Sequence, residues 1–148
     1  MPTYEVRDWV DVYHVQRRTI DFASGLGFSK RECGELAIVA SELASNILKY
    51  GIRGSIELDA VEEGGKAGIS LVASDRGPPF RNLESAMLDG HDDSGPIDPL
   101  HMLKRNGIGG GLGAVLRLSH SFRVENVPGG KRLHVARYLS SRRSRRPR

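Results

Sequence analysis

The chain has 148 residues, 39% hydrophobic and 27% charged, as expected of an ordinary soluble globular domain. No apolar run approaches the roughly 20 residues that span a bilayer, and the charged segment 1–8 is not a secretory signal. Cys33 is the only cysteine, so an internal disulfide and a thiolate zinc cluster are excluded. These features predict a cytoplasmic protein with no membrane segment.

The net charge of +4 is unevenly distributed along the chain. Five arginines lie in the last seven residues, and removing them from the 22 basic residues leaves 17 against 18 acidic ones. We therefore expect one domain over residues 1–140 and an Arg-rich disordered tail over 141–148. A solvated tail and a contact with an acidic partner or nucleic acid are both compatible with this composition. The body has no helix-turn-helix signal, which argues against specific nucleic-acid binding.

Two elements are predicted at the start of the chain. Alternation of Tyr4, Val6 and Trp9 predicts a short first strand. Apolar residues then recur at helical spacing from about residue 10 to 23, which predicts a first helix. Gly25 is expected to end that helix in a left-handed conformation.

The second helix has the strongest pattern. Ser29 and Glu32 form a capping box at its start, and Gly51 provides a stop after Tyr50. At 100° per residue, one face should be buried against a sheet, and it comprises Leu36, Val39, Ala40, Leu43 and Ile47. A polar stripe lies about 90–120° away at the rim of the core, and it comprises Glu35, Glu42, Asn46 and Lys49.

The rest of the chain predicts two hairpins, a third helix and one long polar segment. The elements are strands near 56–60 and 69–73 around a turn at 62–66, a helix near 112–119, and strands near 122–124 and 133–135 around a turn at 128–130. Residues 81–110 are rich in Gly, Asp and Pro, and so long an irregular segment usually has a function. This order predicts an α+β, two-layer sandwich: one mixed sheet with helices on one face.

Glu42 and Asn46 are the first candidate site residues. They are i, i+4 neighbours, so both can reach one bound ion or water. Magnesium takes oxygen ligands and often only one or two from protein, so the Asn46 amide oxygen could bind it. Glu42 could orient or deprotonate a hydroxyl. The alternative is an ordinary solvated helix face with routine charges.

Asp75 lies in a stiff turn that runs on through Gly77 and two prolines. One interpretation is that the Asp75 side chain caps its own turn, as aspartate commonly does. The other places its carboxylate at the base of a pocket, where it accepts the exocyclic N–H of adenine. Guanine has a carbonyl oxygen at that position and would be rejected.

Five of the seven residues from 107 to 113 are glycines, namely Gly107, Gly109, Gly110, Gly111 and Gly113. Glycine lets backbone N–H groups approach a phosphate, and a helix starting near Leu112 adds its positive N-terminal dipole. The run is not a P-loop, and it does not follow the parallel strand of a Rossmann motif. A flexible hinge without a ligand is the alternative.

Together these segments resemble a known family. Segments 42–50, 75–80 and 107–113 resemble the N, G1 and G2 boxes of the GHKL ATPases, which share the Bergerat, or histidine-kinase-like ATPase, fold. Segments 41–51, 86–90 and 111–118 look most like the RsbT-type bacterial serine/threonine kinases, which are stressosome switch kinases and close cousins of the RsbW-type anti-sigma-factor kinases.

The resemblance implies a role for each matching residue. Glu42 would be the general base, Asn46 the Mg²⁺ ligand, and Lys49 a phosphate or ribose contact. Asp75 would select adenine, and Gly77 would let the base approach. The phosphates would be held by the glycine run, at Gly109, Gly111, Leu112 and Gly113. The segment from about 81 to 110 would be a lid that closes over ATP.

The implied function is an ATP- and Mg²⁺-dependent serine/threonine protein kinase. Its substrate would be a STAS-domain antagonist or scaffold protein in a partner-switching pathway that controls a sigma factor or another output. A sigma factor, a downstream phosphatase and a second copy of the chain are further expected partners. The competing hypotheses are a nucleotide-dependent anti-sigma or partner-binding module with little turnover, and an ATPase that gates an assembly by dimerising.

Overall fold

The computed structural model describes residues 2–50, 52–77, 91–92, 95–96 and 111–140. The elements in chain order are β1 (Thr3–Val6), α1 (Trp9–Leu26), α2 (Lys30–Tyr50), β2 (Gly54–Glu63), β3 (Lys66–Asp75), β4 (His91–Asp92), β5 (Gly95–Pro96), α5 (Gly111–Arg117), β6 (Ser121–Val127) and β7 (Gly130–Tyr138). The expected helix stop at Gly51, most of the expected lid over 81–110 and the tail over 141–148 lie outside the described residues.

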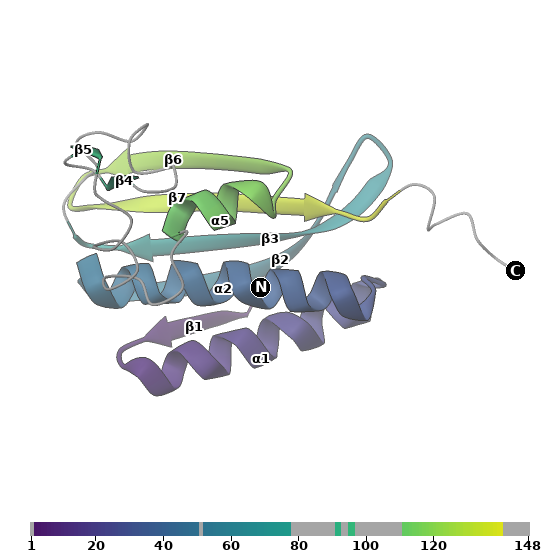
Figure 1. The fold of residues 1–148 in the computed structure, drawn as a ribbon, viewed down its shortest axis with the longest axis horizontal. Helices are drawn as coiled ribbons and strands as arrows, with labels where there is room; N and C mark the ends of the chain where they lie inside the picture. Colours follow the sequence, from purple (N-terminus) through teal and green to yellow (C-terminus); the bar gives the residue numbers. More distant parts are fainter. Residues whose placement is uncertain (1, 51, 78–90, 93–94, 97–110, 141–148) are drawn as a thin grey trace, which may run out of the picture.

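Five strands form one sheet in the order β1-β2-β3-β7-β6, and α1, α2 and α5 lie on one face of it (Figure 1). This confirms the predicted two-layer α+β fold. The expectation of a mixed sheet was wrong, because every neighbouring pair of described strands is antiparallel. Two pairs are hairpins. Strand β1 is connected to β2 by the helices α1 and α2. These run out and back, so the chain returns to the same end of the sheet.

The core lies between the helices and the sheet. The predicted apolar face of α2 is buried along its length, which confirms the helical periodicity of that segment. It packs against inward-facing residues of the central strands, of which the largest are Ile56, Leu58, Ile69, Leu71 and Leu133. Burial of these side chains is the main favourable term that fixes the position of α2 over the sheet.

The first helix differs from its prediction at both ends. Trp9 begins α1 instead of extending the first strand, because Asp8 caps the helix and exchanges capping-box bonds with Asp11. The helix continues past Gly25 and ends at Gly27, which has a φ of 106°. Gly25 could also have ended the helix. Gly27 ends it instead, because its left-handed conformation lets the following chain turn back into the core.

The remaining local predictions are confirmed. The Ser29 N–H donates to Glu32 Oε1 at 2.8 Å, and the Glu32 N–H donates to Ser29 Oγ at 3.1 Å. Both hairpins form, and α5 ends at Arg117, two residues before its expected end. None of the helices in the described ranges is long and apolar enough to cross a bilayer.

Gly130 allows two backbones to approach closely at one end of the sheet. A Cβ built at this position would lie 2.1 Å from the carbonyl oxygen of Asp75 and 3.1 Å from the Cα of Arg76. Any side chain here would push β7 away from the end of β3. The glycine therefore fixes the geometry next to the turn that carries Asp75.

Candidate functional site

The C-terminal half of α2 supplies Glu42 and Asn46 from adjacent turns of one helix. Both are partly buried, and Lys49, one turn further on, is exposed. Their neighbours Leu43 and Ile47 are buried in the core, so this part of the helix cannot rotate without exposing apolar surface. The polar pair is therefore held at the rim, as the helical periodicity predicted.

Glu42 has an electrostatic environment suited to proton transfer. Burial raises the pKa of its carboxyl group above the usual glutamate value, and the nearby Lys49 ammonium opposes this by lowering it. A glutamate that holds its proton more tightly is a better base once ionised. The combination leaves Glu42 with a raised pKa and a cation close by.

Glu35 lies on the same stripe but has a structural role. Its carboxylate accepts a hydrogen bond from Arg137 Nη2 at 2.8 Å and lies 3.4 Å from Nε of Arg31. These contacts join α2 to the last strand. The polar stripe therefore divides into a structural part near the start of the helix and the Glu42–Asn46 pair further along.

Two polar atoms near the predicted site are buried without a hydrogen-bond partner. They are Nδ2 of Asn46 and Oδ2 of Asp75, and they are the only such side-chain atoms within the described ranges. Leaving a buried donor or acceptor unpaired costs about 1–3 kcal/mol. Buried polar groups are paired in almost all proteins, so two orphans on neighbouring elements suggest a polar ligand that pairs with them.

The second oxygen of Asp75 is well bound. Its Oδ1 accepts the N–H of Gly77 at 2.7 Å and a hydrogen bond from Nζ of Lys131 at 3.0 Å. The side chains of Asp75 and Lys131 are only 1% and 3% exposed. The two interpretations of Asp75 are thus compatible, because one oxygen caps the turn and the other remains available to a ligand.

Lys131 is a site residue that the sequence interpretation missed. It pairs with Asp75 in the register of β3 and β7, so the two side chains project from neighbouring strands. A signal was present, since alternation along β7 places Lys131 on the same face as the buried Leu133 and Val135. A lysine on a buried face needs an acidic partner, and Asp75 was the available candidate.

The start of α5 is the third part of the candidate site. This helix packs against α2, and its second and third residues, Leu112 and Gly113, are buried. Gly111 is the first residue of the helix, whereas Gly107, Gly109 and Gly110 lie outside the described residues. The structure thus brings the end of the glycine run next to the helix that carries Glu42 and Asn46.

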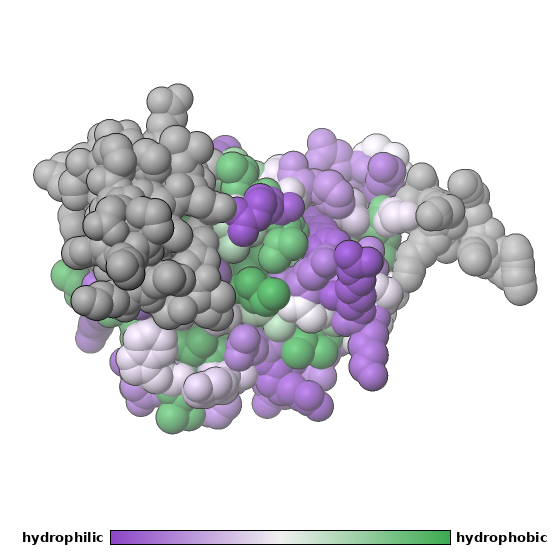
Figure 2. Space-filling model, in the orientation of Figure 1, coloured by the Kyte–Doolittle hydropathy of each residue, from purple (hydrophilic) through white to green (hydrophobic). Residues whose placement is uncertain are grey.

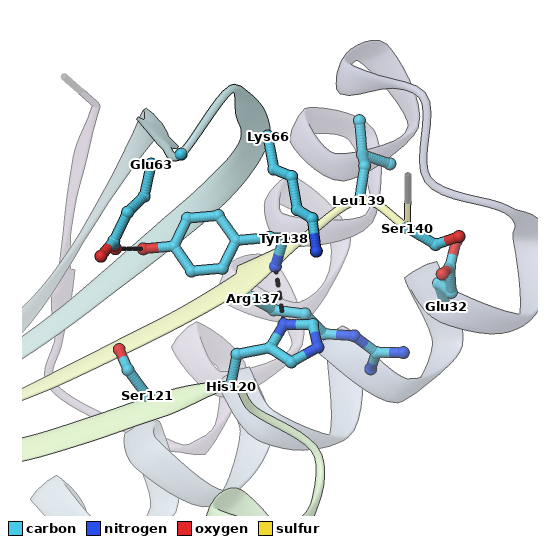
Figure 3. A pocket seen from close by; sticks show the side chains of 10 residues that line it. Glu32, Glu63, Lys66, His120, Ser121, Arg137, Tyr138, Leu139 and Ser140 are labelled. Carbon is cyan, nitrogen blue, oxygen red and sulfur yellow. Dashed lines mark hydrogen bonds between the residues drawn. The ribbon is translucent and has the colours of Figure 1, made fainter. Parts of the chain in front are cut away.

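A separate cavity of about 780 Å³ lies at the opposite end of the sheet (Figure 3). Within it the Tyr138 hydroxyl donates to Glu63 at 2.9 Å, and the Tyr138 N–H donates to Nδ1 of His120 at 2.9 Å. Acidic Glu32 and Glu63 line it together with basic Lys66 and Arg137. The cavity lies away from Glu42, Asn46 and Asp75, none of which lines it, so it is not part of the candidate site.

The Asp75–Lys131 pair yields a prediction about stability. Lys131→Met should lower the free energy of unfolding by about 3–5 kcal/mol, because it leaves a buried carboxylate without its cation. The double variant Asp75→Asn/Lys131→Met should recover most of that loss. Urea unfolding measures the free energy of unfolding of the wild type, the single variant and the double variant. Lys66→Met, at an exposed site, serves as the control. Equal losses in the single and double variants would contradict the role assigned to the pair.

The comparisons with known proteins agree with the predicted family and fold. The chain is 30% identical over 133 residues to the serine/threonine-protein kinase RsbT of Bacillus subtilis (strain 168), covering 89% of this chain and 91% of that protein. It also superposes on a chain from the crystal structure of the SiaB-SiaC complex of Pseudomonas aeruginosa, with a TM-score of 0.55, 13% identity, and coverage of 94% of this chain and 90% of that chain. The second similarity concerns the fold alone.

The resemblance inferred from the three sequence segments is therefore confirmed at the level of the family. A family model described as the histidine kinase-like ATPase domain matches residues 7–137, which is most of the chain. Together with the similarity to RsbT, this shows that the chain belongs to the histidine kinase-like ATPase domain family.

Proposed function

We propose that this chain is a protein kinase that binds Mg·ATP and transfers the γ-phosphoryl group to a serine or threonine of a STAS-domain partner. The observation that carries the proposal is the buried, unpaired Oδ2 of Asp75. Its other oxygen is fixed by a backbone N–H and an ammonium group. The unpaired oxygen is thus an immobilised acceptor that requires a donor from a ligand.

Adenine supplies the required donor. Its exocyclic amino group would donate to Oδ2 of Asp75, and this bond would be charge-assisted because its acceptor is a carboxylate. Guanine would place a carbonyl oxygen against the same carboxylate, leaving two acceptors facing each other without a proton. Gly77 follows in the turn, and its lack of a side chain would let the base approach.

Phosphates and metal would bind between α2 and the start of α5. The Asn46 amide can present its oxygen to Mg²⁺ if its terminal group rotates by half a turn. When bound, Mg²⁺ neutralises charge on the phosphates during transfer. Backbone N–H groups of Gly109, Gly111, Leu112 and Gly113 would hold the phosphate oxygens, and Lys49 could contact a phosphate or the ribose.

Glu42 would act as the general base in the transfer step. The substrate hydroxyl oxygen forms a bond to the γ-phosphorus while the bond from that phosphorus to the bridging oxygen of ADP breaks. Glu42 accepts the hydroxyl proton, and ADP leaves with the electron pair of the broken bond. Closure of segment 81–110 over the nucleotide would exclude water and favour transfer over hydrolysis.

The choice of partner rests on the similarity to RsbT, which is named as a serine/threonine kinase. A STAS-domain antagonist or scaffold is the proposed substrate, and control of a sigma factor or another output by partner switching is the proposed consequence. The site would operate in the cytoplasm. A nucleotide-dependent binding module with little turnover is the competing function, and the transfer assay below separates the two.

The first prediction concerns phosphoryl transfer. Wild-type protein incubated with radiolabelled ATP, Mg²⁺ and a STAS-domain protein from the same organism should label that protein. Glu42→Ala should lower the transfer rate about 10²–10⁴-fold, because the proton acceptor is lost. Glu62 is exposed near the end of β2, in the β2–β3 hairpin, so the Glu62→Ala protein should transfer phosphate at the wild-type rate. Tight binding of the partner without any labelling would favour the binding module instead.

The second prediction concerns base selection. Asp75→Asn should weaken Mg·ATP binding at least about tenfold, because the adenine amino group loses a charged acceptor. Isothermal titration calorimetry measures the dissociation constant, and a thermal melt shows that the variant is folded. Wild-type protein should show no comparable heat with Mg·GTP. Unchanged ATP affinity in folded Asp75→Asn would remove Asp75 from the site.

The third prediction concerns pH. Glu42 must be ionised to accept a proton, and burial raises its pKa, so kcat/KM should rise with pH through a value above the ordinary glutamate pKa. Lys49→Met removes the cation that lowers this pKa and should shift the acid limb further upward. Initial rates across a pH series at constant ionic strength test both statements. A Lys49→Met profile that moves downward or stays in place would contradict them.

A further inference from the structure

Three arginines surround a second cavity at the same end of the sheet as Asp75. We call Arg7, Arg53 and Arg76 the arginine pocket, and the cavity that they line has a volume of about 510 Å³. Its remaining lining residues are Glu5, Val6, Gly54 and Ser55. Nothing in the proposed nucleotide site accounts for this cluster.

The sheet topology brings the three arginines together. Arg7 follows the last residue of β1, Arg53 precedes the first residue of β2, and Arg76 follows the last residue of β3. Strands β1, β2 and β3 are neighbours, so these chain positions meet at one end of the sheet (Figure 1). The N–H of Arg76 also donates to the carbonyl oxygen of Ile52 at 2.7 Å, which ties two of the segments together.

The pocket carries excess positive charge on its surface. All three arginines are exposed, and Arg7 is paired with Glu5. Arg53 and Arg76 have no ion-pair partner within the part of the chain that the structure describes. The body of the chain is nearly neutral, so this charge is a local feature. Unpaired guanidinium groups are suited to binding carboxylates in a forked geometry.

Arg53 has a backbone conformation that does not suit arginine. Its φ is +51°, and it is the only non-glycine residue with a positive φ among those described. Glycine would adopt this conformation without strain. A strained residue that persists at such a position usually has a functional use for its side chain.

Exposed aromatic and aliphatic side chains lie on the neighbouring elements. Trp9 and Tyr13, at the start of α1, are 53% and 69% exposed, and Val10 and Ile52 are also exposed. Figure 2 shows residues of high and of intermediate hydropathy over the start of α1. Tryptophan, tyrosine and arginine are the residue types that contribute most binding energy at protein interfaces. The chemistry therefore fits a protein partner better than a small anion.

We propose that the arginine pocket docks an acidic segment of the STAS-domain protein that the kinase phosphorylates. This proposal rests on the proposed function, and it adds the surface and the charge of the partner. Docking at this end of the sheet holds the substrate beside the Asp75 turn. The pocket contributes to binding and encounter and takes no part in the transfer step.

Steady-state kinetics with a STAS-domain protein from the same organism test the docking surface. Arg7→Gln/Arg53→Gln should raise the KM for that protein about tenfold and leave kcat and the calorimetric Kd for Mg·ATP within twofold of wild type. Arg76 is left intact because it adjoins Asp75. The matched control is Arg18→Gln/Arg123→Gln, which removes two exposed arginines elsewhere and should change KM less than twofold. Raising the salt concentration should narrow the difference between wild type and the pocket variant.

Arg53→Gly separates docking from folding, because glycine relaxes the positive φ. It should keep the wild-type melting temperature or raise it, while still increasing the KM. Equal effects of the pocket and control variants on KM, or no effect of either, would overturn the proposal.

Calorimetric binding of the unphosphorylated partner distinguishes failure of this proposal from failure of the kinase function. Partner binding that depends on Arg7 and Arg53 without phosphoryl transfer supports the docking surface and contradicts the kinase function. Absence of any partner binding to wild-type protein overturns the docking proposal.

Discussion

The buried pair between Asp75 and Lys131 is the interaction on which the candidate site depends. A carboxylate inside a protein needs a compensating charge, and Lys131 on the neighbouring strand provides one at 3.0 Å. Because Lys131 and the Gly77 N–H both bind Oδ1, the second oxygen keeps its full accepting capacity. A ligand that pairs with that oxygen therefore relieves an existing deficit in hydrogen bonding.

The rest of the fold keeps this arrangement in place. Gly130 lets β7 approach the carbonyl of Asp75, which positions Lys131 opposite its partner. The apolar face of α2 packs against the same sheet and holds Glu42 and Asn46 at the rim. Contact between α2 and α5 brings the end of the glycine run to that helix. Each candidate group thus depends on packing in the shared core.

Features that depend on local sequence could be predicted. The buried and polar faces of α2 followed from helical periodicity, the Ser29–Glu32 box from its spacing, and both hairpins from alternation around glycine turns. The prediction of a mixed sheet was wrong because strand direction depends on how two long helices return the chain. The alternation of β7 held a signal for a buried Lys131, but its contact with Asp75 and the arginine pocket were missed because each joins segments far apart in sequence. Gly25 and Gly27 offered similar local signals, and only the second lies where the chain must turn.

Arg76 belongs to two surfaces at once. Its side chain lines the arginine pocket, whereas its backbone separates Asp75 from Gly77 and bonds to Ile52. A shift of the Arg76 backbone would therefore move atoms that border both surfaces. If both proposed ligands bind, thermodynamic linkage requires reciprocity: the factor by which the nucleotide changes the affinity for the protein equals the factor by which the protein changes the affinity for the nucleotide. Arg76 is thus the residue through which the proposed nucleotide site and the arginine pocket adjoin one another.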